Sequence, residues 1–163
     1  MQVITPVTLK DLIDVMKMMA EIERLIAELY RASAEAWVED REFWLETVAE
    51  EEKHANNIER MIEIIAARPE RFELGRLFNQ TAIKTIKTGL EGNIERVKKG
   101  EIAREKMLNL ARDIEASLIE KSYGEIVRTK DVEYQNLVNE ITTDTRSHKN
   151  AIEQRIHALK AGN

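Results

Sequence analysis

The sequence contains a Glu-x-x-His motif formed by Glu51 and His54. Residues three apart project from the same side of an α-helix, so this carboxylate and this imidazole can reach one metal ion. The chain has no cysteine, which excludes disulfides, iron–sulfur clusters and thiolate metal sites. Any metal must therefore be held by histidine and carboxylate. Such ligands suit iron or manganese, and zinc could occupy them without redox chemistry.

Two more acidic residues fall within apolar helical stripes. Glu23 lies between Met19 and Ile26, and Glu115 follows Ala111 by four residues. Burying a lone carboxylate costs on the order of several kcal/mol, so such a group must be paired, protonated or bound to a metal. These positions therefore need a partner inside the fold.

A last candidate is His148, which lies four residues before Ile152 on a further stripe. Asp144 and Thr145 are close enough in angle to share its face of the helix. Three glutamates and two histidines that converge can satisfy one another most simply through a cation, because the metal charge offsets the desolvation of all of them. We therefore expect one metal site at Glu23, Glu51, His54, Glu115 and His148.

An internal pseudo-repeat supports this convergence. Glu23 precedes His54 by 31 residues, and Glu115 precedes His148 by 33 residues. Each of these glutamates is followed seven or eight residues later by a tyrosine, namely Tyr30 and Tyr123. Two similar hairpins would place the two sets on facing sides of one site.

Four apolar stripes with three- and four-residue spacing predict the helices that must carry these residues. Thr8 and Asp11 resemble a capping box, which predicts a first helix over residues 9–37. A second stripe begins after Asp40 and ends before Pro69. A third stripe runs through Met107, Leu108, Ala111, Leu118, Ile119 and Ile126. A fourth follows Thr129-Lys130-Asp131 and includes Tyr134, Leu137, Ile141, Ile152 and Leu159.

Residues 69–100 contain four glycines and only short apolar patterns, which predicts a crossover with one or two short helices. The fold is then all-α: a bundle of two antiparallel helical hairpins joined by a long connection. With 163 residues, the chain fits a single domain over 1–163.

The composition excludes several classes of protein. With 43% hydrophobic and 34% charged residues, six glycines and two prolines, the chain is neither disordered nor rich in β-turns. The net charge is −5 and the basic residues are dispersed, so we expect no nucleic-acid partner. No stretch approaches the ~20 apolar residues of a membrane span, and the N-terminus does not resemble a signal peptide. A cytoplasmic protein that does not bind membranes is expected.

Several segments resemble a known family. ERLIAELY, from Glu23 to Tyr30, and AEEEKHA, which contains Glu51 and His54, closely resemble the first hairpin of the rubrerythrin-like, ferritin-like diiron carboxylate proteins. GNIERVKKGEIAREKMLNLARDIEASLIEKSY resembles the crossover and third helix of short bacterial members, and RSHKNAI resembles the start of the last ligand-bearing turn. The resemblance covers residues 9–159 and implies a ferritin-like four-helix bundle, in the short form without the rubredoxin domain.

The resemblance also implies a site with one Glu from each of the first and third helices and a Glu-x-x-His pair from each of the others. Glu23, Glu51, His54, Glu115 and His148 match this pattern. Thr145 departs from it, because it stands where the family has a second metal-bridging Glu. Asp144 is the candidate replacement; without it, we expect an asymmetric or singly occupied site.

The expected function is oxidation of Fe(II), or reduction of peroxide or dioxygen, at two iron ions, or at one ion if the site is degenerate. Glu51 would bridge the metals and Glu23 and Glu115 would be terminal ligands, while His54 and His148 would each hold one iron. Tyr30 and Tyr123 would donate hydrogen bonds to the carboxylates. Because no cysteine-ligated iron domain is possible, electrons would come from an external donor protein, and a homodimer is expected by analogy.

Two other interpretations remain open at this point. The chain could be a non-catalytic bundle that binds a metal or a partner at a degenerate site, which Thr145 favours. It could also be a purely structural bundle, in which the inward acids are protonated or paired with Lys or Arg.

Overall fold

The computed structural model describes residues 2–117 and 123–162. The chain is 81% helical, with five helices and one small sheet among these residues, so the predicted all-α class is confirmed. The helices are α1 (Pro6–Ala36), α2 (Arg41–Ala67), α3 (Gln80–Lys98), α4 (Arg104–Glu115) and α6 (Val132–Ala161). None of the helices in the described residues is long and apolar enough to cross a membrane.

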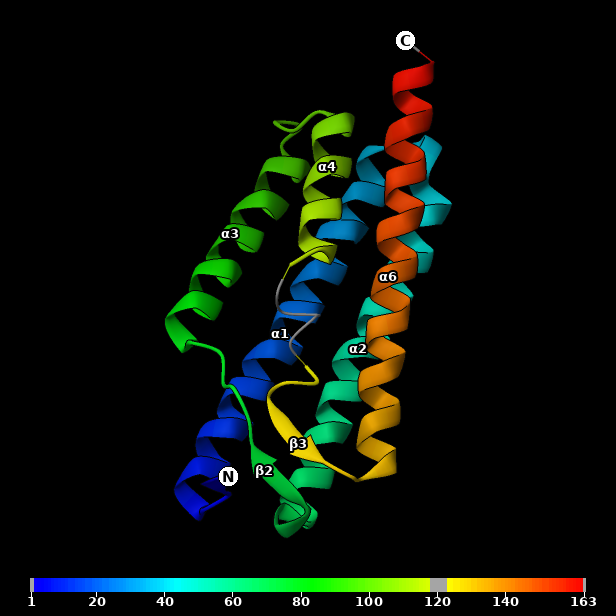
Figure 1. Cartoon of the computed structure of the whole chain (residues 1–163). Coiled ribbons are helices and arrows are strands. Elements are labelled where there is room, and N and C mark those ends of the chain that lie inside the picture. Colours follow the sequence, from blue (N-terminus) through cyan, green and yellow to red (C-terminus); the bar gives the residue numbers. More distant parts are fainter. Residues whose placement is uncertain (1, 118–122, 163) are drawn as a thin grey trace.

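The first two helices form an antiparallel hairpin closed by a 3-10 turn at Val38–Asp40 (Figure 1). α1 begins earlier than the capping pattern of the sequence predicts. Thr5, not Thr8, is the N-cap: the Thr8 N–H donates to Thr5 Oγ1 (3.2 Å), and the Thr5 N–H donates to Thr8 Oγ1 (2.8 Å). Pro6 then takes the first helical position, where its fixed φ is favourable and its missing N–H has no helical partner to lose.

The connection after α2 begins with a 3-10 turn at Pro69–Arg71 and then contains α3, whose 19 residues make it longer than the short helices that the sequence predicts. Gly89 and Gly92 lie within α3 at positions where an added Cβ would meet nothing within 4 Å, so these exposed glycines do not interrupt the helix. α3 packs on α1 through one apolar face. The buried residues of that face are Ile83, Leu90, Ile94 and Val97.

The third predicted helix ends sooner than its apolar stripe suggested. α4 stops at Glu115, and Ile126 belongs to a turn that leads into strand β3 (Val127–Thr129). Of the other predicted stripe residues, Leu118 and Ile119 lie outside the described residues. The helix does not continue to Ile126 because the chain there pairs with strand β2 (Phe72–Leu74) and the residue after it: the Gly75 N–H donates to the Ile126 carbonyl (2.8 Å), and Val127 pairs with Leu74. A Cβ at Gly75 would lie 2.0 Å from the Glu125 carbonyl oxygen, so only glycine permits this approach.

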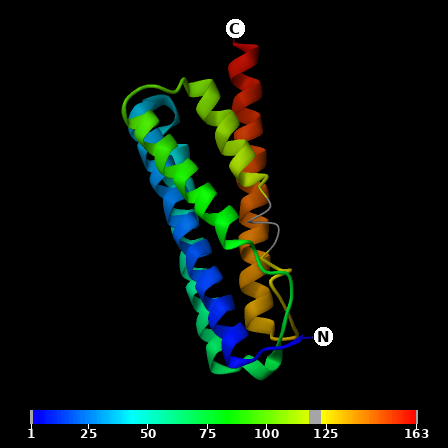
Figure 2. The ribbon, with the colours of Figure 1, turned by 90° about the vertical axis from the view of Figure 1, so that its left-hand side faces the viewer.

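A three-stranded antiparallel sheet closes the end of the molecule that carries the N-terminus (Figure 2). Its strands, in spatial order, are β1 (Gln2–Val3), β2 (Phe72–Leu74) and β3. Asp131 follows β3 and caps α6, because its side chain accepts a hydrogen bond from the Tyr134 N–H (3.1 Å). The sheet thereby fixes where α6 starts.

The helices pack around one continuous apolar core. α2 lies against both α1 and α6, and α6 also lies against α4 (Figure 1). Facing residues of α1, α2, α4 and α6 fill the space between the helices, among them Met19, Ile26, Ile58, Ala111 and Ile152. The polar residues considered next lie within this core.

Candidate metal centre

Five polar side chains from four helices are buried together in the core. α1 supplies Glu23, α2 supplies Glu51 and His54, α4 ends at Glu115, and α6 supplies His148. None is more than 5% exposed. They form two groups whose ligand atoms lie within 4.8 Å of one another: Glu23, Glu51 and His54 in the first, and Glu51, Glu115 and His148 in the second.

Glu51 is common to both groups, and its two oxygens face opposite ways. Oε2 lies 3.3 Å from His54 Nδ1, and Oε1 lies 2.9 Å from His148 Nδ1. Glu115 Oε2 lies 3.8 Å from the same nitrogen of His148. Each half of the centre thus has one histidine, one glutamate of its own and one oxygen of Glu51.

Two buried tyrosines hold the outer glutamates in a crossed arrangement. The hydroxyl of Tyr30, on α1, donates to Glu115 Oε1 of α4 (2.7 Å). The hydroxyl of Tyr123 donates to Glu23 Oε1 of α1. Each tyrosine therefore serves the glutamate of the other pseudo-repeat. These bonds orient both carboxylates toward the centre.

The charged groups of the centre shift the pKa values of one another strongly. Burial alone would raise the pKa of Glu51, but the neighbouring His148 and His54 lower it to about 2. Burial likewise favours neutral His148, yet Glu115 and Glu51 raise its pKa to about 11. Burial and the charge of Glu51 raise the pKa of Glu115. The carboxylates thus draw positive charge into a site that is closed to solvent.

Asp144 and Thr145 do not join either group. Asp144 Oδ2 lies 3.2 Å from Nε2 of His54, the ring nitrogen that faces away from Glu51, and 2.8 Å from Lys53 Nζ. The Lys53 and His54 charges lower the pKa of Asp144 against the opposing effect of burial. The hydroxyl of Thr145 is buried and forms no hydrogen bond with the described residues.

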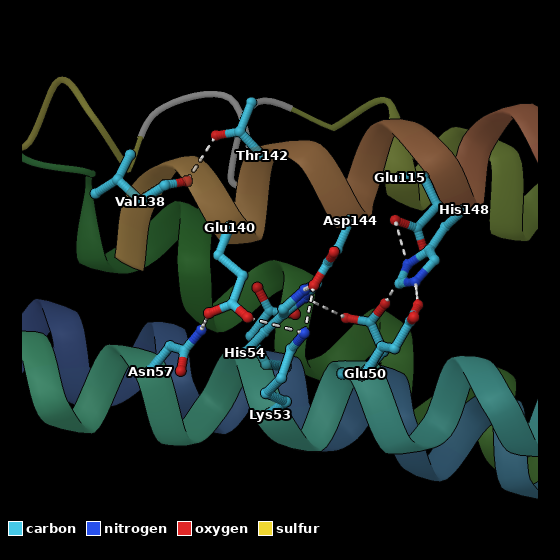
Figure 3. A network of polar contacts seen from close by, with 12 residues as sticks. Glu50, Lys53, His54, Asn57, Glu115, Val138, Glu140, Thr142, Asp144 and His148 are labelled. Carbon is cyan, nitrogen blue, oxygen red and sulfur yellow. Dashed lines mark hydrogen bonds and ion pairs between the residues drawn. The ribbon is translucent and has the colours of Figure 1, made fainter. Parts of the chain in front are cut away.

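One contact of the centre was missed from the sequence. Glu50 Oε2 is hydrogen-bonded to Nε2 of His148 (Figure 3). Glu50 precedes His54 by four residues, as Asp144 precedes His148, so a search for carboxylates four residues before each histidine would have found both. Its role could not be inferred from one helix, because the histidine that it contacts is on another.

The donor set fits a divalent metal. Carboxylate oxygens and imidazole nitrogens suit iron, manganese or zinc. Glu51 Oε1, His54 Nδ1 and His148 Nδ1 are buried, and none of them makes a hydrogen bond within the described part of the chain. Buried polar atoms are normally satisfied, so these three atoms are available as ligands. No protein-family model, curated protein or solved structure matches the chain.

Proposed function

We propose that this chain is a ferritin-like metal protein that holds two divalent ions, iron in the first instance, between its helices. The placement of Glu51 carries the proposal. Its carboxylate lies between the Nδ1 atoms of His54 and His148, as expected of a group that bridges two ions. Glu23 and Glu115 would then complete two halves of equal composition.

The helix arrangement supports assignment to the rubrerythrin-like, ferritin-like diiron carboxylate family. α1, α2, α4 and α6 each supply at least one ligand, as in bundles that build a metal site from side chains on facing helices. α3 would be the crossover between the two hairpins, lengthened into a helix that covers α1.

Two halves of equal composition favour two ions over one. The missing fourth-helix glutamate removes the second bridge of the family pattern, but Asp144 is not needed to complete either half. Thr145 would leave the side opposite Glu51 without a protein ligand.

The proposed activity is oxidation of Fe(II) coupled to reduction of peroxide or dioxygen. Two bound Fe(II) ions would supply the two electrons that, with two protons, convert one hydrogen peroxide to two waters. The protein would keep the ligands away from bulk water and hold Glu23 and Glu115 in place through the hydroxyls of Tyr123 and Tyr30. A separate electron-donor protein would return both ions to Fe(II) after each cycle.

The alternative function is non-catalytic metal binding. The observation in its favour is Thr145, whose short side chain leaves the centre with one carboxylate fewer than the family pattern. A purely structural role requires the inward acids to be protonated or paired with Lys or Arg. The raised pKa of Glu115 favours the first arrangement for that residue, but Glu51 has a lowered pKa, and the described contacts of Glu51 and Glu115 are with neither Lys nor Arg.

The test is anaerobic loading with Fe(II), measurement of iron per chain, and then addition of air or peroxide while near-ultraviolet absorbance of Fe(III) is followed. Wild type should hold two ions per chain and oxidise both. Glu51→Gln should lose both, because the amide cannot offer two anionic oxygens to two ions.

Glu52→Gln is the matched control. It makes the same substitution one residue further along α2, at an exposed side chain that pairs with Arg31, and should bind iron like wild type. One or two ions that stay unreactive toward air and peroxide would support the non-catalytic alternative. Absence of bound iron in the wild type would contradict both metal-binding proposals.

A further inference from the structure

On the outer side of the centre, each histidine contacts a carboxylate that is not one of the candidate metal ligands. Each histidine turns Nδ1 toward Glu51 and presents Nε2 to a carboxylate near the surface (Figure 3). His54 Nε2 meets Asp144, and His148 Nε2 meets Glu50. A carboxylate oxygen can accept a hydrogen bond from a ring N–H, so both contacts fit a proton on Nε2.

These two pairs are crossed between α2 and α6. Glu50 and His54 are four residues apart on α2, and Asp144 and His148 are four apart on α6. Residues at this spacing lie one turn apart on one helix face. Each carboxylate nevertheless contacts the histidine of the other helix, so the two contacts connect α2 to α6 at the centre.

We propose that Glu50 and Asp144 are the positioning residues of the two histidines, Glu50 for His148 and Asp144 for His54. The inference rests on the proposed metal-binding function and revises the role of Asp144 from possible ligand to positioning group. Neither carboxylate belongs to the two groups of candidate ligands. Each would favour the proton on Nε2 of the neutral ring, so that Nδ1 would be the nitrogen that faces the ion.

The physical reason is tautomer control. A neutral imidazole carries its proton on either nitrogen, and only the unprotonated nitrogen can bind a metal. A carboxylate at Nε2 favours the tautomer with a free Nδ1, fixes the angle of the ring and increases the basicity of the ligating nitrogen. Without it, the ring could rotate or protonate the ligating nitrogen.

The two carboxylates are anchored to different extents. Asp144 also binds Lys53 (2.8 Å), which in turn binds Glu140 (3.1 Å), and Glu140 accepts a hydrogen bond from Asn57 (2.8 Å). The side chain of Asp144 is 21% exposed, whereas that of Glu50 is 45% exposed. We therefore expect His54 to be held more rigidly than His148.

The experiment uses Zn(II) as a redox-inert probe. Its affinity is measured by calorimetry, and long-range 1H–15N correlations of the imidazole rings report which nitrogen carries the metal and which the proton. In the wild type, both rings should show metal on Nδ1 and a slowly exchanging proton on Nε2. Glu50→Ala should accelerate exchange at His148 alone, and Asp144→Ala at His54 alone. Each variant should weaken one of the two sites by about 10- to 100-fold.

Conservative and neighbouring variants separate positioning from general structural effects. Glu50→Gln and Asp144→Asn keep an acceptor oxygen, so they should restore slow exchange and most of the affinity. Glu52→Ala and Glu133→Ala remove comparable carboxylates from α2 and α6 that contact neither a histidine nor Lys53, and should leave both rings unchanged.

Zn(II) binding and the behaviour of the imidazole rings test the proposed function and the crossed pairs separately. Two bound Zn(II) ions with unchanged rings in Glu50→Ala and Asp144→Ala would overturn the crossed pairs and leave metal binding intact. An effect of each variant on the histidine of its own helix would also overturn them. Failure of the wild type to bind Zn(II) would overturn both.

Discussion

Two buried acidic groups of this protein meet the cost of desolvation in different ways. Asp40, in the turn between α1 and α2, accepts hydrogen bonds from Arg104 Nε (2.6 Å) and Nη2 (2.9 Å) and from Arg155 Nη1 (2.9 Å). Glu51 has instead two histidines, and its Oε1 makes no hydrogen bond in the described structure. Both carboxylates are almost completely removed from solvent.

The difference shows that a buried carboxylate does not by itself indicate a functional site. The positive charge that Asp40 needs is built into α4 and α6, and Arg155 also stacks 4.2 Å from the ring centre of Phe43. Every oxygen of Asp40 is used to join three parts of the fold. The candidate metal centre has buried ligand atoms around Glu51 that make no hydrogen bond in the described structure, so a bound cation could complete its charge balance.

The largest expected effect of a single substitution on the free energy of unfolding is at Asp40. Asp40→Asn should lower the free energy of unfolding by about 3 kcal/mol, because Arg155 and Arg104 lose the buried carboxylate that they share, Arg104 keeps only the exposed Glu39 (3.7 Å), and the new amide points a donor at other donors. Chemical denaturation measures this. Arg104 and Arg155 are only about a third exposed, which limits how far water can replace the lost partner.

Metal binding should not depend on the Asp40 cluster, which consists of Asp40, Arg104 and Arg155. Asp40→Asn should still bind two Zn(II) ions, because Asp40 contacts none of the centre residues. Glu39→Gln, at the exposed neighbouring carboxylate, should change the unfolding free energy little. A loss of metal binding in Asp40→Asn would mean that the two regions are not independent.

The second effect is metal-dependent stabilisation. Zn(II) at 100-fold above its Kd should raise the unfolding free energy of the wild type by about 2.7 kcal/mol for each site. Asp40→Asn should show the same increment from a lower starting point. Glu51→Gln should show almost none, and a chelator should abolish the increment in the wild type.

Sequence reasoning located the residues that share a helix face, and it was least informative where the arrangement depends on two helices. Glu51 and His54 could be paired because three residues along one helix fix their geometry. Glu50 could not be assigned, because its contact with His148 depends on how α2 packs on α6. The exchange of tyrosines between the pseudo-repeats depends on packing in the same way.

Contacts between distant segments also explain the errors in the predicted fold. The apolar stripe continued past Glu115, but Ile126 lies in the turn before β3, where its carbonyl accepts a hydrogen bond from the Gly75 N–H next to the pairing of β3 with β2. Strands of two or three residues are too short to give a periodic signal. The glycines in residues 69–100 suggested that any helix there would be interrupted. The sequence does not show that Gly89 and Gly92 lie on the exposed face of α3, where a helix tolerates them.

The third effect concerns the tyrosines. Tyr30→Phe and Tyr123→Phe should each lower the unfolding free energy of the metal-free protein by about 1–2 kcal/mol, because each removes a buried hydroxyl that donates to a carboxylate. Tyr134→Phe is the matched control. Its hydroxyl is buried and makes no hydrogen bond in the described part of the chain, so its removal should cost nothing measurable by denaturation. Equal losses in all three variants would show that the tyrosines act only through packing.

The smallest effect is expected at Thr145, where the family pattern has a glutamate. Thr145→Val should change the unfolding free energy by less than about 0.5 kcal/mol or increase it, because the buried hydroxyl forms no described hydrogen bond. Thr142→Val, one turn earlier on α6, should cost about 0.5–1 kcal/mol, because its hydroxyl donates to the Val138 carbonyl (2.9 Å; Figure 3).

The number of Zn(II) ions bound by Thr145→Val tests whether the two halves of the centre are equivalent. If Glu51 alone bridges two equal halves, Thr145→Val should still bind two Zn(II) ions with wild-type affinity. Loss of one ion would mean that the Thr145 hydroxyl supports one half, and the centre would then be asymmetric. The candidate centre would then resemble the Asp40 cluster more closely, because both would depend on a polar side chain of the protein that is not one of the candidate metal ligands.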